Sequence, residues 1–220
     1  MIVKFHTTLE TMADFHERLG FVPLDRILMN PPPGTATEAD VLRFLGAADK
    51  RLCELVDGTL VEKAMGFVES ILASYIIHKL VEFVNSNDLG VVTSPDGSFR
   101  TMSGNVRYPD ASFVPWTAFP NGELPTNKIS LVPPVLVVEV LSESNTTAEI
   151  DRKLRELFSS GCRLAWVIDP ETKTAKVYSS AGRFKELATD GVLDGGKVLP
   201  GFRLPLPELF ATTKKRKKKS

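Results

Sequence analysis

The stretch "VLVVEVLSESN", residues 135–145, has the pattern of a buried strand that contains a single charged residue. Apolar residues, mostly β-branched, lie on both sides of Glu139; two prolines precede the run and a polar segment follows it. A continuous apolar run between turn residues is typical of a strand covered on both faces of a sheet. An ionised carboxylate is strongly unfavourable in such a place unless a cation or several donors meet it. The stretch therefore predicts a central strand, and the partner of Glu139 becomes the question to answer.

The composition of the chain indicates one globular domain. Of its 220 residues, 43% are hydrophobic, which is enough for a sizeable core. No basic start followed by an apolar segment is present, and the quoted run is too short and too charged to span a bilayer. Two cysteines without a metal-type spacing favour a reduced, cytoplasmic location, and three scattered histidines argue against a zinc site.

Charge is distributed unevenly along the chain. The 27 basic and 27 acidic residues balance, but six of the basic ones stand together in Lys214–Lys219, so the rest is net acidic. Such a block is ordinarily a solvated, disordered end. The functional alternative is an arm that binds phosphates without sequence preference.

Hydrophobic periodicity and turn residues predict alternating helices and strands. A helical pattern over Leu9–Leu19 and a stiff linker at Asn30–Thr35 form an N-terminal helical extension. Thr35 and Glu38 resemble a capping box that opens a helix. Two alternating runs around Asp57 and Gly58 predict a β-hairpin. Further helices are predicted at Phe67–Asn85 and Thr147–Ser159, with strands at residues 89–94, around 99, 108–114, 135–141, on both sides of Pro170 and near 202.

This order of elements predicts an α/β protein with a central mixed sheet and helices packed on it. We expect residues 1–35 to form the extension, residues 36–211 the main domain and residues 212–220 a disordered basic tail.

Three acids and one lysine are placed to converge on the predicted sheet. Asp110 follows a proline at the mouth of one strand, and its carboxylate can emerge beside Glu139 if the two strands are neighbours. Glu69 continues the core-facing stripe of the helix that begins at Phe67, and Lys153 flanks the inner face of the helix after Glu139. Oxygen ligands of this kind suit Mg²⁺ or Mn²⁺.

Each of these residues also has an ordinary explanation. Asp110 could be part of a common Pro-Asp turn, and Glu69 in a first helical turn is favourable through the helix dipole alone. Lys153 could be a solvated cation, and Glu139 could face water from an edge strand. The constellation carries more weight than its members, because the order of the residues fits a known arrangement.

That arrangement is the PD-(D/E)XK nuclease superfamily, within which the chain resembles the bacterial putative restriction endonuclease family, first catalogued as a domain of unknown function. The resemblance covers roughly residues 51–210 and implies a restriction-endonuclease-like core. It rests on the stretches "LCELVDGTLVEKAMG", "GFVES", "RYPDASFV", "PPVLVVEVLSESNTTAEIDRKLRELFSSGCRLAWVIDPETKTAKVY" and "LDGGKVLPGFRLPLPELF".

The resemblance implies a role for each site residue. Asp110 corresponds to the motif aspartate, Glu139 to the motif acid and Glu69 to the acid of the first helix. Leu141 stands where the simple motif has its lysine, and the family resemblance moves that lysine to Lys153 on the following helix.

The implied metal is Mg²⁺, with Mn²⁺ as a substitute. Asp110, Glu139 and the Val140 carbonyl would hold it, and Glu69 would bind directly or through water. Glu62 is a further candidate ligand of lower rank.

The leading function is therefore a divalent-metal-dependent DNA endonuclease, expected to be a homodimer with no membrane association. The alternative is a nucleic-acid-binding module on a nuclease scaffold with weak or no cleavage. A third interpretation, a purely structural homo-oligomer, predicts affinity for neither metal nor nucleic acid. Stabilisation by Mn²⁺ would separate the first hypothesis from the other two.

Overall fold

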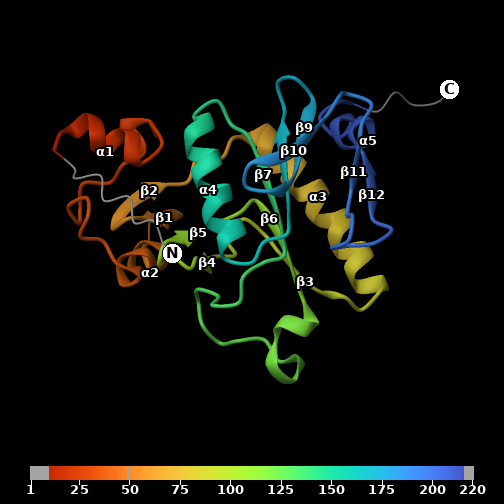
Figure 1. Ribbon diagram of the computed structural model, residues 1–220, viewed down its shortest axis with the longest axis horizontal. Coiled ribbons are helices and arrows are strands. Elements are labelled where there is room, and N and C mark those ends of the chain that lie inside the picture. Colours follow the sequence, from red (N-terminus) through yellow and green to blue (C-terminus); the bar gives the residue numbers. More distant parts are fainter. Residues whose placement is uncertain (1–9, 49, 216–220) are drawn as a thin grey trace.

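A computed structural model of the protein describes residues 10–48 and 50–215. Its centre is a six-stranded mixed sheet with strand order β10-β9-β8-β7-β6-β3 (Figure 1). The strands are β3 (Gly90–Thr93), β6 (Ala111–Pro115), β7 (Leu136–Val140), β8 (Leu164–Asp169), β9 (Thr174–Ser180) and β10 (Arg183–Leu187). β7 pairs in parallel with β8 and antiparallel with β6. The strand that carries Glu139 is therefore central, which excludes the edge-strand explanation for this residue.

A four-stranded sheet with the order β2-β1-β5-β4 lies beside the central one. Its strands are β1 (Cys53–Val56), β2 (Thr59–Glu62), β4 (Phe99–Arg100) and β5 (Val106–Arg107). Asp57 and Gly58 both have positive φ, 47° and 70°, as a two-residue hairpin turn of type I′ requires. The predicted hairpin is confirmed. β11 (Val192–Asp194) and β12 (Arg203–Pro205) form a small third sheet.

The two long helices, α3 (Phe67–Ser86) and α4 (Thr147–Ser159), cover opposite faces of the central sheet (Figure 1). Side chains alternate between the faces of a strand. Leu136 and Val138 of β7 accordingly pack in the core cluster that includes α3, whereas Val137 packs in the cluster that includes α4. Glu139 is two residues after Val137 and therefore points towards the same face, the one that α4 covers. Its partner can therefore come from α4 and not from α3.

The N-terminal extension contains α1 (Met12–Arg18) and the short 3-10 helix η1 (Leu24–Arg26). Its apolar residues Leu19, Val22 and Ile27 pack against the β1–β2 hairpin. With α2 (Glu38–Gly46) it forms one end of the molecule, and α5 (Leu206–Ala211) lies at the other end (Figure 1). Two further 3-10 helices follow β6, at Trp116–Ala118 and Pro120–Gly122.

Several local predictions need correction. The capping box of α2 is formed by Thr37 and Asp40, while the hydroxyl of Thr35 donates to the Pro32 carbonyl instead. β5, β10 and β11 were not predicted, since β5 and β11 are too short for a pattern and β10 has the polar sequence "RFKEL".

No helix in the described part of the chain is both long and apolar enough to cross a membrane. Of the predicted basic tail, residues 216–220 lie outside the described residues.

Candidate active site

Asp110 and Glu139 lie side by side where β6 begins. The register pairs Ala111 with Val138, so that Asp110 continues the ladder next to Glu139. Both residues are 5% exposed. The Val140 N–H donates to Asp110 Oδ2 over 2.7 Å, which fixes the aspartate to the backbone of β7. The structure therefore brings these two acids together on the side of the sheet that α4 covers.

Lys153 is the partner of Glu139. Its Nζ lies 2.8 Å from Glu139 Oε2 and 2.9 Å from Glu54 Oε1, and it donates to the Tyr108 carbonyl over 3.3 Å. An ammonium has three hydrogens to donate, and each has an acceptor here. Lys153 lies on the inner face of α4, so the side chain crosses the helix–sheet interface to reach the acids. The buried position of Glu139 is thus explained by a buried cation.

The second oxygen of Glu139 has no such partner. Glu139 Oε1 is a buried oxygen without a hydrogen-bond partner, and Glu139 lines a cavity of about 20 Å³, enough for about one water-sized occupant. Asp110 and Val140 line the same cavity. Carboxylate oxygens around a space of this size suit a small, hard divalent cation. The residues therefore fit the metal that the sequence predicts.

Burial shapes the ionisation of this group. Burial raises the pKa of Glu139 to about 7, with Lys153 opposing the rise and Asp110 adding to it. Burial acts to lower the pKa of Lys153, but Glu139 and Glu54 outweigh it and hold that pKa above the usual range. Lys153 therefore keeps its charge at neutral pH, while the pKa of Glu139 is raised towards neutrality. A cation bound in the cavity would favour the ionised carboxylate.

Glu54 is a site residue that the sequence analysis did not identify. It lies on β1 opposite Arg107 on β5, and Arg107 Nη1 is 2.7 Å from Glu54 Oε2. Burial alone would raise the pKa of Glu54, but Lys153 and Arg107 outweigh it, so the pKa lies well below the usual range. Glu54 interrupts an apolar strand just as Glu139 does, and this shared pattern could have revealed it.

Lys63 is a second lysine of the site and was also missed. It follows the last residue of β2, and its side chain is 7% exposed. Nζ lies 2.8 Å from Asp110 Oδ1 and donates to the Tyr108 carbonyl over 2.7 Å. A lysine just beyond a hairpin strand has no sequence pattern that distinguishes it from a solvated cation. Only the packing of the two sheets places it here.

Glu69 lies apart from the other acids. It belongs to α3, which packs on the opposite face of the central sheet, and it lines a separate cavity with Ser142 and Asp169. Its carboxylate lies over Gly66 at the helix N-terminus, where a Cβ would come within 2.2 Å of Glu69 Oε2. A carboxylate in that place is favoured by the helix dipole. The apolar stripe indicates that the helix faces the sheet, but it does not indicate which face of the sheet the helix covers.

Among residues 10–48 and 50–215, no group of three or more His, Cys, Asp or Glu side chains is arranged to hold a metal ion. Glu62, the lower-ranked candidate ligand, is 39% exposed and lies 3.7 Å from Arg51. The ligand roles of Asp110, Glu139, Val140, Glu69 and Glu62 thus all stay predictions.

The N-terminal extension contributes one wall of the cavity. Arg26 forms two contacts with Glu149 of α4, at 2.8 and 3.1 Å, and both residues line the cavity. The same guanidinium donates to the Glu62 and Ser144 carbonyls over 2.9 and 3.2 Å. The extension is therefore fastened directly to the rim of the site.

The fold that holds this group has a counterpart among solved structures. The structure is similar to the crystal structure of a putative nuclease belonging to DUF820 from Anabaena variabilis, with a TM-score of 0.67 at 20% identity over 79% of this chain and 97% of that chain. The restriction-endonuclease-like core predicted from the sequence is thereby confirmed.

Residues 38–207 match the family Uma2, described as putative restriction endonuclease, and the chain belongs to this family. Among curated proteins, none is significantly similar to the chain. Arg26 precedes the matched residues, so the wall that it forms lies outside the part of the chain that the family defines.

Proposed function

We propose that the protein is a divalent-metal-dependent endonuclease that hydrolyses phosphodiester bonds in DNA. The observation that carries this proposal is the buried oxygen of Glu139 without a partner, in a cation-sized cavity beside Asp110 and Lys153. Membership of a nuclease family supports the reaction class, and the donor chemistry supports Mg²⁺ with Mn²⁺ as a substitute.

Asp110, Glu139 and the Val140 carbonyl are the residues that would hold the metal. When bound, the cation would neutralise charge on the phosphodiester and help to ionise the attacking water. Asp110 is already held in place by the Val140 N–H, and Glu139 has an oxygen that needs a partner. Glu69 would contribute through water from its neighbouring cavity.

Lys153 would stabilise the charge that grows on the phosphate during attack. Its contacts with Glu139, Glu54 and the Tyr108 carbonyl fix the ammonium before substrate arrives, as preorganised stabilisation requires. Arg107 supports this arrangement because it donates to Glu54 Oε2, while Lys153 contacts the other carboxylate oxygen, Oε1.

A cavity of about 20 Å³ does not admit a phosphodiester, so substrate binding requires that its rim opens. The rim contact between Arg26 and Glu149 is the obvious obstacle. We infer that the extension is displaced or rearranged when DNA engages the site.

The deciding experiment is cleavage of supercoiled plasmid, linear duplex and single-stranded DNA with Mg²⁺, Mn²⁺ or EDTA. Wild-type protein should cleave only with the divalent cation, and Asp110→Asn and Glu139→Gln should each cleave about 10²-fold more slowly or worse. DNA binding without cleavage under every condition would instead support the nucleic-acid-binding alternative. Cleavage that persists in EDTA would contradict the metal dependence.

The assembly and location predicted from the sequence are part of the same proposal. A homodimer is checked by analytical ultracentrifugation of the full chain. Cys53 and Cys162 are both buried and free, which is compatible with a reducing, cytoplasmic environment.

A further inference from the structure

The two lysines of the cavity are held in different ways. Lys153 uses all three of its ammonium hydrogens, on Glu139, Glu54 and the Tyr108 carbonyl. Lys63 contacts Asp110 Oδ1 and the same carbonyl, and it comes from the end of a hairpin strand rather than from a helix packed on the sheet. Lys63 is therefore the more easily displaced of the two.

The two acids differ in a matching way. Glu139 keeps one buried oxygen without a partner. Asp110 keeps none, because Oδ2 accepts from the Val140 N–H and Oδ1 contacts the ammonium of Lys63. A cation that enters the cavity can reach Glu139 directly, but at Asp110 Oδ1 it meets the repulsion of the Lys63 ammonium.

We propose that Lys63 is a resident counter-ion of Asp110 that competes with the divalent cation and leaves Asp110 when the metal binds. This inference rests on the proposed function, since it concerns the same metal site. It assigns to Lys63 a role in setting metal affinity, and it leaves the displaced ammonium beside the cavity as a cation available to an anionic substrate.

The charges around the cavity favour replacement of the Lys63 ammonium by the divalent cation over binding of both together. Among the side chains that line it, four carboxylates, from Glu54, Asp110, Glu139 and Glu149, face three cations, from Arg26, Lys63 and Lys153. Arg107, behind Glu54, is balanced by its second partner, Glu156. With every group ionised, a divalent cation added to this set would leave an excess of positive charge. With Lys63 outside the cavity, the same cation would balance the set, so exchange avoids a buried excess of charge.

The lysine side chain can make this exchange without a change in the fold. Its ammonium is carried on a flexible four-carbon stem whose bonds rotate independently. Nothing in the ladder of β2, which ends at Glu62, depends on the position of Nζ. Movement of Lys63 therefore breaks only the contacts of its ammonium with Asp110 and with the Tyr108 carbonyl. The metal then replaces the ammonium as the partner of Asp110.

Metal affinity in the absence of nucleic acid tests the exchange. We suggest titrating Mn²⁺ by calorimetry into wild-type protein and into Lys63→Met, Lys63→Gln and Lys63→Arg variants. The two neutral variants should bind Mn²⁺ about tenfold more tightly or better, because a unit-charge repulsion at contact distance is removed. Lys63→Arg keeps the charge and should bind like wild type. Lys50→Met is the matched control, since Lys50 pairs with Asp96 at an exposed position.

A second measurement uses the unaltered protein, in case Asp110 without its partner prevents folding of the variants. Amine-reactive labelling followed by mass spectrometry should modify Lys63 faster when Mn²⁺ is present. Lys153 should stay protected in both conditions, and Lys50 should react equally in both.

The outcomes separate the inference from the function on which it rests. If wild-type protein binds Mn²⁺ and the neutral variants bind it equally or less tightly, Lys63 is only a structural partner of Asp110 and the inference is wrong. Labelling of Lys63 that Mn²⁺ leaves unchanged has the same meaning. If none of the proteins binds Mn²⁺, the metal site itself fails, and the proposed function with it.

Discussion

Glu139 and Lys153 form a buried ion pair between the central strand and the helix that follows it, with 2.8 Å between Oε2 and Nζ. The chain leaves β7, forms α4 and returns as β8, parallel to β7, so α4 packs on the face towards which Glu139 projects. Leu141, at the position of the simple motif lysine, packs in the apolar cluster below α4. The partner cation of Glu139 thus comes from α4, so residue 141 does not need to be a lysine and can be apolar.

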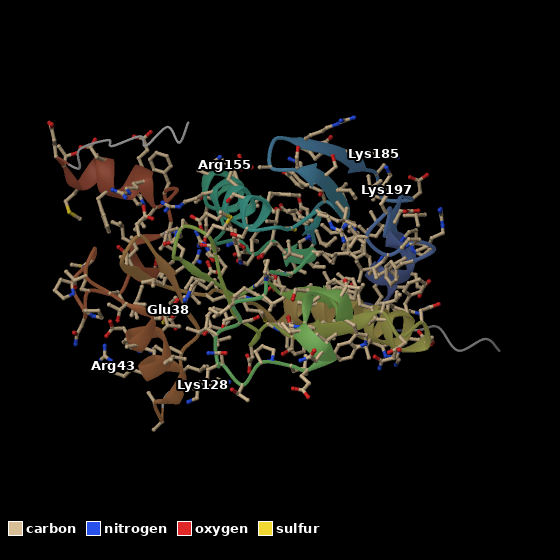
Figure 2. All side chains as sticks on the ribbon, turned by 60° about the horizontal axis from the view of Figure 1, so that its bottom comes forward. Glu38, Arg43, Lys128, Arg155, Lys185 and Lys197 are labelled. Carbon is tan, nitrogen blue, oxygen red and sulfur yellow. The ribbon has the colours of Figure 1, made fainter. Side chains whose placement is uncertain are left out.

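Replacing Lys153 should damage the chemical step most. Lys153→Met removes the ammonium that we propose stabilises the developing phosphate charge, and single-turnover cleavage should slow by about 10²-fold or more. Arg155→Met is the control, because Arg155 lies exposed on the outer side of the same helix (Figure 2). Arg152 is unsuitable as a control, since it pairs with Asp57 and Glu156. Similar rates for the two variants would show that Lys153 is not catalytic.

The stability of the metal-free protein should depend on pH through Glu139. The folded-state pKa is about 7, above the ordinary value of 4.5. Between these values the folded chain retains a proton that the unfolded chain has already released, so stability falls as the pH rises from about 4.5 to 7.

Glu139→Gln lacks this penalty, and its advantage over wild type should grow across the same interval to roughly 3 kcal/mol and then level off. Urea denaturation in EDTA at several pH values measures it. Glu143→Gln, at an exposed position, should follow wild type throughout. Parallel stability curves for wild type and Glu139→Gln would contradict the raised pKa.

Metal binding should depend less on Glu69 than on the two acids of the cavity. Mn²⁺ should raise the melting temperature of the wild-type protein by mass action. Asp110→Asn and Glu139→Gln should abolish most of that rise. Glu69→Gln should keep most of it, because the Glu69 carboxylate lines a neighbouring cavity and not the one that Asp110 and Glu139 line. Loss of the entire rise in Glu69→Gln would mean that its side chain turns into the cavity and binds directly.

Arg26 should contribute strongly to stability. Arg26→Met leaves Glu149 buried without its cation and should cost about 3–5 kcal/mol of unfolding free energy. Arg43→Met breaks an exposed pair with Asp40 and should cost about 1 kcal/mol or less. The double change Arg26→Met with Glu149→Met should recover part of the loss. Equal destabilisation in the Arg26 and Arg43 variants would argue that the extension is only loosely attached.

The basic tail remains a separate prediction. If Lys214–Lys219 binds phosphates, deleting it should weaken binding to all DNA sequences alike. The log–log dependence of affinity on salt should flatten by about 0.9 for each duplex phosphate that the tail neutralises. Affinity measured over a range of salt concentrations with full-length and truncated protein gives this slope. The same slope for both proteins would mean that the tail is a solvated end that does not bind phosphates.

The sequence by itself determined the elements whose causes are local. The Asp57-Gly58 turn needs positive φ at two neighbouring residues, and these two residue types meet that requirement by themselves. The bounds of α4, Thr147–Ser159, match the predicted helix because its apolar spacing and its Thr146 cap act within the helix. The lone glutamate in an apolar strand indicated a buried cation by the cost of burying a charge, and Lys153 supplies that cation.

Only the tertiary structure decided which side chains meet. A helix presents its apolar stripe to a sheet without specifying which face; the fold places α3 and α4 on opposite faces of the central sheet, and Glu69 and Glu139 line separate cavities. Lys63 and Arg26 are ordinary cations in the sequence and become site residues because the fold brings the end of the hairpin to Asp110 and the extension to α4. These contacts join segments far apart in the chain, and a buried charge is tolerated only where the fold brings an opposite charge to it, which no local pattern records.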